Sequence, residues 1–186
     1  MRRLFLRLRR ADGYGLPEVL IVLAMTTMLA SMTVLSISAA LPRFRADSAL
    51  ITLAGQISLA RELAVSSRRN VELRFIAPGT VQLWRWNGGA AALISAVVLE
   101  NNMRYLLFTG IPDTPDAYGR TAAVDFATAT RLQYLADGTF VDQNLVPLNG
   151  TVFAGIVGRP ETARSITVLG STGRVTSFKW TGTIWK

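Results

Sequence analysis

Three hydrophobic patterns follow one another along the chain. The first is a continuous apolar run, because no side chain from Val19 to Pro42 carries a charge. A helix of roughly 24 residues is about 36 Å long, which is enough to cross the hydrocarbon core of a bilayer. The run therefore predicts a transmembrane helix close to the N-terminus.

The second pattern has the period of an amphipathic helix. Beyond Pro42, apolar side chains recur at spacings of three and four residues: Leu50, Leu53, Ile57, Ala60 and Ala64. This spacing places them on one face of a helix. We expect an amphipathic segment over 43–70, with the helix ending near Ser67 and Pro42 marking a possible bend. A stripe that faces a core is favoured over a short coiled-coil seam.

The third pattern has a period of two and begins at residue 71. Val71, Leu73 and Phe75 alternate with other side chains, and turn-forming residues follow at 77–80 and 87–89. Further strands are expected at 81–86, 92–99, 103–108, 122–127, 131–135, 151–156, 164–169 and 174–180. The segment 111–120 is expected to be an exposed loop. Successive strands with short turns are typical of antiparallel sheets, so the sequence predicts an α+β protein.

The composition removes several kinds of chemistry. The chain has no Cys and no His, so it lacks disulfides, thiolate metal ligands and the commonest general base. No serine or carboxylate motif of a known hydrolase class replaces them, and Glu62 and Glu72 are expected to be solvated. We therefore expect a protein that is not an enzyme, with no cofactor and no small-molecule substrate.

The acidic turns contain candidate metal ligands. Asp137, Asp142 and Asn144 supply oxygen atoms, but their spacing differs from that of an EF-hand loop. A tight Asp-Gly turn explains the same residues. We therefore predict no metal site.

The basic residues are concentrated at the N-terminus. The net charge is +8, and residues 1–13 hold five of the 20 basic and one of the 12 acidic residues. The remainder carries 15 basic and 11 acidic residues, a net charge of +4. Arginines before an apolar run keep their side of the helix cytoplasmic and place the C-terminal part outside.

Two simple interpretations fit this basic start. A plain signal-anchor is one. A cleaved secretory signal is the other, with small residues at 38–40 as the cleavage site, although the apolar core of such a signal is only about 7–15 residues long.

Glu18 is an acidic residue at the mouth of the apolar run. A carboxylate at the centre of a membrane helix costs about 2.5–3.5 kcal/mol on insertion scales, and charges that persist there usually have a partner. A carboxylate near a helix N-terminus is also favoured by the helix dipole. The residue therefore requires either a local or an intermolecular partner.

The segment 13–20, GYGLPEVL, resembles the type IV prepilin motif, which has a glycine, an aromatic residue, a glutamate at the fifth mature position and then a hydrophobic helix. The resemblance implies that prepilin peptidase cuts after Gly13 and that Tyr14 is N-methylated. It also implies that Glu18 pairs with the N-terminal amine of a neighbouring subunit. Phe is the usual residue at the position of Tyr14. Pro17 is tolerated in the first helical turn.

The resemblance implies a pilin fold, a long N-terminal helix packed on an antiparallel head. Residues 1–13 would be a cleaved leader, 14–42 the transmembrane and assembly helix, 43–70 the amphipathic helix and 71–186 the head. The protein would be a single-pass inner-membrane protein with a cytoplasmic leader and a periplasmic head. It would then join a fibre of other pilin or pseudopilin subunits, either a type II secretion pseudopilus or a type IV pilus.

The end of the chain resembles a subgroup of this superfamily. The segments 150–152 and 166–168 and the turn 170–175, GSTGRV, are similar to the tail of the FimT/GspH group of minor pilins and pseudopilins. Some FimT-type pilins are associated with DNA uptake through a basic turn near the C-terminus. This implies an alternative function, DNA binding, with Arg174 and Lys179 contacting phosphates. Affinity for phosphates comes from several cations acting together.

Overall fold

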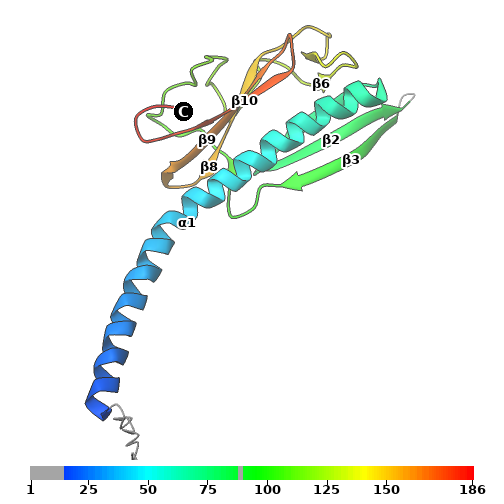
Figure 1. Cartoon of the computed structure of the whole chain (residues 1–186). Helices are drawn as coiled ribbons and strands as arrows, with labels where there is room; N and C mark the ends of the chain where they lie inside the picture. Colours follow the sequence, from blue (N-terminus) through cyan, green and yellow to red (C-terminus); the bar gives the residue numbers. More distant parts are fainter. Residues whose placement is uncertain (1–14, 88–89) are drawn as a thin grey trace, which may run out of the picture. The chain divides into compact units, whose positions relative to one another are not determined.

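A computed structural model describes residues 15–87 and 90–186. Its one long helix, α1, runs from Leu16 to Ser67, so the helix ends where the sequence predicts. The chain divides into two compact units, and the boundary lies within α1, between Ala40 and Leu41. Figure 1 traces this helix from blue to cyan.

The described part of the first unit is the apolar half of α1. Leu16–Val34 is long and apolar enough to cross a membrane, and none of it is buried within the protein. Its hydroxyl groups are satisfied within the helix: Thr26 and Thr27 donate to the carbonyls of Leu23 and Ala24, each over 2.9 Å. Hydrophobic side chains all round and internally bonded polar groups are what a lipid environment requires.

The second unit begins at Leu41 and is built on the amphipathic half of α1. The predicted apolar stripe is confirmed, because each of its residues is at most 5 % exposed: Leu50, Leu53, Ile57, Ala60 and Ala64. The alanines Ala46 and Ala49 extend the same buried face. Small side chains allow the helix axis to approach the sheets closely, while Leu53 and Ile57 fill the space between them.

The first sheet, sheet A, has the strand order β3-β2-β1-β6-β7. All of its pairings are antiparallel. Val71 and Leu73 of β1 and Val81 and Leu83 of β2 are buried in the same core as the helix stripe. The strands are β1 (Val71–Ile76), β2 (Thr80–Asn87), β3 (Ala90–Val98), β6 (Leu132–Tyr134) and β7 (Phe140–Val141).

The second sheet, sheet B, has the order β10-β9-β8-β4, with β5 also paired to β8. These pairings are antiparallel as well. Val152, Ile166 and Val168 join the helix stripe in the main core. The strands are β4 (Arg104–Tyr105), β5 (Val124–Asp125), β8 (Gly150–Ile156), β9 (Arg159–Leu169) and β10 (Arg174–Lys179). Figure 1 shows the second half of α1 lying across both sheets.

A smaller core covers the other face of sheet B. Its buried residues are Ile111, Phe153, Ala163 and Trp185. Trp185 donates its indole N–H to the carbonyl of Pro112 over 2.9 Å. The prediction that 111–120 is simply exposed was wrong, since Ile111 and Thr114 are buried. This loop has no regular structure, but it packs on the sheet because β9 would otherwise expose an apolar second face.

This arrangement confirms the α+β class predicted from the sequence, with a long N-terminal helix whose second half packs on antiparallel sheets. The last hairpin was predicted most closely, since β9 and β10 flank the turn at 170–173. Three strands differ most in extent: the expected strands at 103–108 and 122–127 shrink to β4 and β5, and β9 begins five residues earlier, at Arg159. β7 was not predicted, because a strand of two residues is too short to show an alternation of apolar and polar side chains.

Candidate functional site

Glu18 lies in the first turn of α1 and is exposed. Its Oε2 accepts a hydrogen bond from the backbone N–H of Gly15 over 3.3 Å. Gly15 in turn accepts from the N–H groups of Glu18 and Val19 through its carbonyl. A glutamate three residues after the N-cap that reaches back to the N-cap N–H is one half of a capping box. Gly13 and Tyr14 lie outside the described residues.

The two cations predicted to contact DNA both lie on β10, but they do not form one site. Arg174 pairs in register with Leu169, and Lys179 with Arg164. Positions five residues apart on a strand are about 17 Å apart and point to opposite faces. Lys179 lies on the face that packs against α1, and Arg174 lies on the other.

Lys179 belongs to an ion-pair cluster that ties sheet B to α1. The carboxylate of Asp47 accepts from Arg164 Nε over 2.8 Å and from Lys179 Nζ over 3.2 Å. Arg164 is only 4 % exposed. Its guanidinium also donates to the carbonyls of Ala163 and Glu161 over 2.8 and 3.2 Å. Because these donors are satisfied inside the protein, Arg164 positions α1 on the sheet. Lys179, whose side chain is half exposed, remains able to contact solvent.

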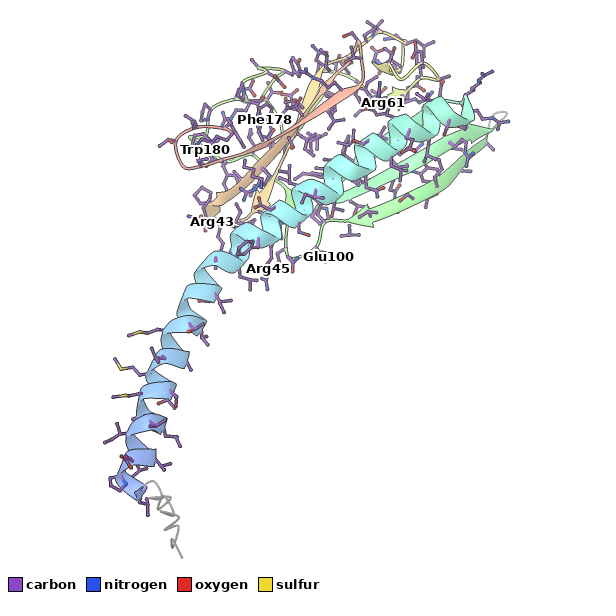
Figure 2. All side chains as sticks on the ribbon, in the orientation of Figure 1. Arg43, Arg45, Arg61, Glu100, Phe178 and Trp180 are labelled. Carbon is purple, nitrogen blue, oxygen red and sulfur yellow. The ribbon has the colours of Figure 1, made fainter. Side chains whose placement is uncertain are left out.

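An open groove of about 650 Å³ begins beside this cluster. Arg43 of α1 and Lys179 of β10 lie on its walls, together with Glu161 and Trp180. Figure 2 shows Arg43 and Trp180 near the same end of the second unit, and Arg61 toward its other end. No sequence pattern indicates this groove, because Arg43 and Lys179 on its walls are more than a hundred residues apart.

Arg174 lies at the end marked by Arg61. Arg61 Nε donates to the carbonyl of Gly138 over 3.4 Å. A Cβ on Gly173 would meet this guanidinium at 3.0 Å, and Gly173 has a positive φ of 63°, so a glycine fits this turn. Tyr134 fixes the same turn by donating its hydroxyl to the Gly173 carbonyl over 3.3 Å. Arg174 itself is exposed.

Glu72 was expected to be solvated, and this expectation was wrong. Its side chain is 6 % exposed and accepts from Arg74 Nε over 2.6 Å and from the indole N–H of Trp86 over 2.7 Å. Arg131 lies 3.7 Å from the same carboxylate. The two guanidinium groups also stack on tryptophans, Arg74 on Trp84 at 4.5 Å and Arg131 on Trp86 at 4.8 Å.

This cluster lowers the pKa of Glu72. Burial alone would raise the pKa, but hydrogen bonds from Arg74 and Trp86 and the charges of Arg74 and Arg131 outweigh it. The alternation of Glu72 and Arg74 on one face of β1 was visible in the sequence. The contribution of Trp86 and Arg131 was not, because it depends on strand pairing.

The acidic turns have a structural role. Asp142 accepts from the N–H groups of Asn144 and Val146 over 2.8 and 2.9 Å, and Asp137 accepts from that of Thr139 over 2.9 Å. These hydrogen bonds lower the pKa of both carboxyl groups. Within residues 15–87 and 90–186, no group of three acidic, His or Cys side chains is placed to hold a metal ion.

Comparison with known proteins finds similarity in fold. No protein-family model matches the sequence, and no curated protein matches it. The structure is similar to the type IV minor pilin FimU of Pseudomonas aeruginosa strain PAO1, with a TM-score of 0.51 and 17 % identity, covering 72 % of this chain and 88 % of that one. The minor pseudopilin EpsH of the Vibrio cholerae type 2 secretion system aligns with a TM-score of 0.49 and 12 % identity over 73 % of this chain and 97 % of that one. The likeness to FimU shows that this chain has the fold of a type IV minor pilin.

The low pKa of Glu72 leads to a prediction about acid stability. Because the folded-state pKa lies below the ordinary value of 4.5, Glu72 stabilises the fold above pH 4.5, and this contribution is lost as the pH falls through the folded-state pKa. Glu72→Gln should therefore reduce the free energy of unfolding by about 1–3 kcal/mol at pH 7. Chemical unfolding of the detergent-solubilised protein, followed by tryptophan fluorescence from pH 7 to 3, measures this.

The matched control for this measurement is Glu62→Gln, which removes an exposed carboxylate. The difference between wild type and Glu72→Gln should shrink below pH 4.5, whereas Glu62→Gln should follow the wild type throughout. A constant difference between wild type and Glu72→Gln at every pH would contradict the assignment of this charge.

Proposed function

We propose that this protein is a minor pilin or minor pseudopilin, a structural subunit of a type IV pilus or a type II secretion pseudopilus. The observation that carries the proposal is the fold shared with FimU, joined to an N-terminal helix whose first half is apolar on all sides. A protein of this design works by assembly. The apolar half of α1 would join the core of the fibre, and the head would face outward.

The membrane stage of this proposal follows from α1. Residues 1–13 would form a cytoplasmic leader that prepilin peptidase removes after Gly13, with N-methylation of Tyr14. The segment 14–42 would hold the subunit in the inner membrane. The amphipathic segment 43–70 and the head, 71–186, would lie in the periplasm.

The fibre stage depends on contacts between helices. Lipid tails are as apolar as the helix, so transfer from lipid to fibre gains little from the hydrophobic effect and relies on packing and polar contacts. Exposed apolar side chains surround the helix, among them Leu20, Val22 and Leu29. Glu18 supplies the polar contact. In the fibre, its carboxylate would exchange the bond to the Gly15 N–H for the N-terminal amine of a neighbouring subunit.

DNA binding is retained as a second candidate, centred on Arg174. The observation that favours it is the approach of the Arg61 guanidinium to Gly173, which puts a second cation beside the turn that precedes Arg174. Lys179 lies on the opposite face of β10 and is engaged by Asp47. A duplex that contacts the 170–174 turn would therefore be bound mainly by Arg174.

The first prediction from this proposal concerns Glu18. Glu18→Ala should leave membrane insertion unchanged, because the apolar run is intact, but should abolish or strongly reduce recovery of the protein in sheared fibres. Quantitative immunoblotting of membrane and fibre fractions measures both. Glu62→Ala removes an exposed carboxylate from the head half of α1 and should incorporate normally. Equal incorporation of Glu18→Ala and wild type would end the proposed role of Glu18.

The DNA candidate makes a separate prediction for the full chain in detergent. In an electrophoretic shift assay at low salt, Arg174→Ala should weaken duplex binding and lower the slope of log affinity against log salt by about one. Lys179→Ala should bind like the wild type, since it lies about 17 Å away on the other face. Absence of binding at low salt, or unchanged binding by Arg174→Ala, would exclude this function.

A further inference from the structure

The end of the second unit where β9 begins carries a concentration of positive charge. Arg43, Glu161 and Lys179 meet there in the 650 Å³ groove. Lys186 lies at the same end, because its backbone forms two hydrogen bonds with that of Lys179. The exposed cations of this end, which we call the basic end, are Arg43, Arg45, Arg159, Lys179 and Lys186. Its nearby acids are Asp47, Glu161 and Glu100, which lines a small pocket with Arg45. Asp47 pairs with the buried Arg164 as well as with Lys179, and the five exposed cations outnumber the three acids, so the charge at this end is positive.

Exposed apolar side chains lie among these cations. Phe44 follows Arg43 on α1 and is 69 % exposed. Val157, at the turn between β8 and β9, is 58 % exposed, and Ile184, in the terminal turn after β10, is 54 % exposed. Thr181 and Gly182 of that terminal turn line the groove together with Arg43 and Pro160. Each of the three apolar side chains therefore lies within three positions of a residue that lines the groove.

The terminal turn that carries Ile184 is held in place. Thr181 N–H and hydroxyl both bond to the Ile184 carbonyl, over 3.0 and 2.8 Å. Trp180 and Trp185 pack against each other at 5.4 Å at the base of this turn. Ile184 is therefore presented on a closed hairpin. An aliphatic side chain fixed outward beside lysine and arginine is typical of surfaces that contact lipid headgroups.

The chain itself brings the basic end near a bilayer. Arg43 is the first charged residue after the apolar run, and it follows the last residue of the first unit by three positions. Three helical residues span about 4.5 Å. If the apolar half of α1 spans a membrane, as proposed above, Arg43 and Phe44 lie at its surface by covalent connection alone.

We propose that the basic end is a docking surface for anionic phospholipid. Its cations bind lipid phosphates, and Phe44, Val157 and Ile184 enter the headgroup layer. The head of a subunit that has not yet joined a fibre is then held on the membrane in one orientation. Entry into the fibre requires release from this surface. This inference rests on the proposed membrane insertion of α1, but it goes beyond it, since a tethered head need not contact lipid.

Lipid fits this surface better than nucleic acid does. Both ligands offer phosphates, and each cation near an anionic bilayer contributes about fivefold to binding. Only a bilayer also offers an apolar layer for three exposed aliphatic and aromatic side chains. Trp180, the aromatic group that a base would stack on, is half-buried and packed against Trp185.

The absence of cysteine allows a direct test on the full chain. A fluorophore is attached to Thr183→Cys in the terminal turn or, as a matched site at the other end, to Ser171→Cys; both positions are exposed. The protein is reconstituted into vesicles of phosphatidylcholine alone or mixed with phosphatidylglycerol, each containing headgroup-quencher lipid. Flotation of the vesicles reports insertion of α1 independently of the fluorophore.

We expect strong quenching at position 183 in the anionic vesicles, little in the neutral ones and little at position 171 in either. Arg43→Gln combined with Arg159→Gln should lower the ratio of docked to free heads in the anionic vesicles by about thirtyfold. Arg68→Gln with Arg174→Gln, which removes the same charge at the other end, should have no effect. Ile184→Ser should reduce quenching without altering flotation.

Several outcomes would overturn the inference. If the protein floats but quenching at 183 is absent, equal to that at 171, or unaffected by the Arg43 and Arg159 changes, the docking surface is wrong while membrane insertion stands. If the protein does not float with vesicles, the proposed anchoring fails and the docking surface fails with it. If a DNA duplex changes the emission at 183 through Arg43 and Arg159 and anionic lipid does not, the surface binds nucleic acid instead.

Discussion

The head depends on one contact, the packing of the stripe from Leu50 to Ala64 against the inner faces of both sheets. Sheets A and B have no strand in common, so α1 provides the wall on which both are assembled. Burial of a leucine or isoleucine side chain contributes about 1.5–3 kcal/mol, and the buried Leu53 and Ile57 belong to the core cluster that also holds side chains of both sheets. The ion pair between Asp47 and Arg164 then fixes the direction of the helix on sheet B.

The same helix has two different surfaces along its length, and this difference is the basis of the proposed function. Up to Ala40 its described side chains are mostly apolar and exposed, apart from Glu18 and a few serines and threonines, whereas from Leu41 one face is buried and the other is exposed. A soluble domain gains nothing from the first half. Exposed apolar side chains on that half are stable only if lipid or other helices cover them. In a membrane-anchored fibre subunit, lipid covers them before assembly and neighbouring helices cover them afterwards.

Local periodicity explains how much of this structure could be predicted. The helix stripe and the hairpin of β9 and β10 were predicted because the hydrophobic period and the turn residues of each lie within one short stretch of sequence. The burial of Glu72, the pairing of Asp47 with Arg164 and the packing of Ile111 could not be, because each depends on residues brought together by the fold. The separation of Arg174 from Lys179 was in principle readable, since five positions on a strand reverse the face.

The central claim, that the protein is a processed fibre subunit, is tested most directly by the mature N-terminus. The protein should be purified from membranes of its own host, and its N-terminal peptide and intact mass should be determined by mass spectrometry. The account predicts a chain that begins at Tyr14 with a methylated amine and retains Glu18 at the fifth position. A mature chain that begins at Met1, or after the small residues at 38–40, would contradict it.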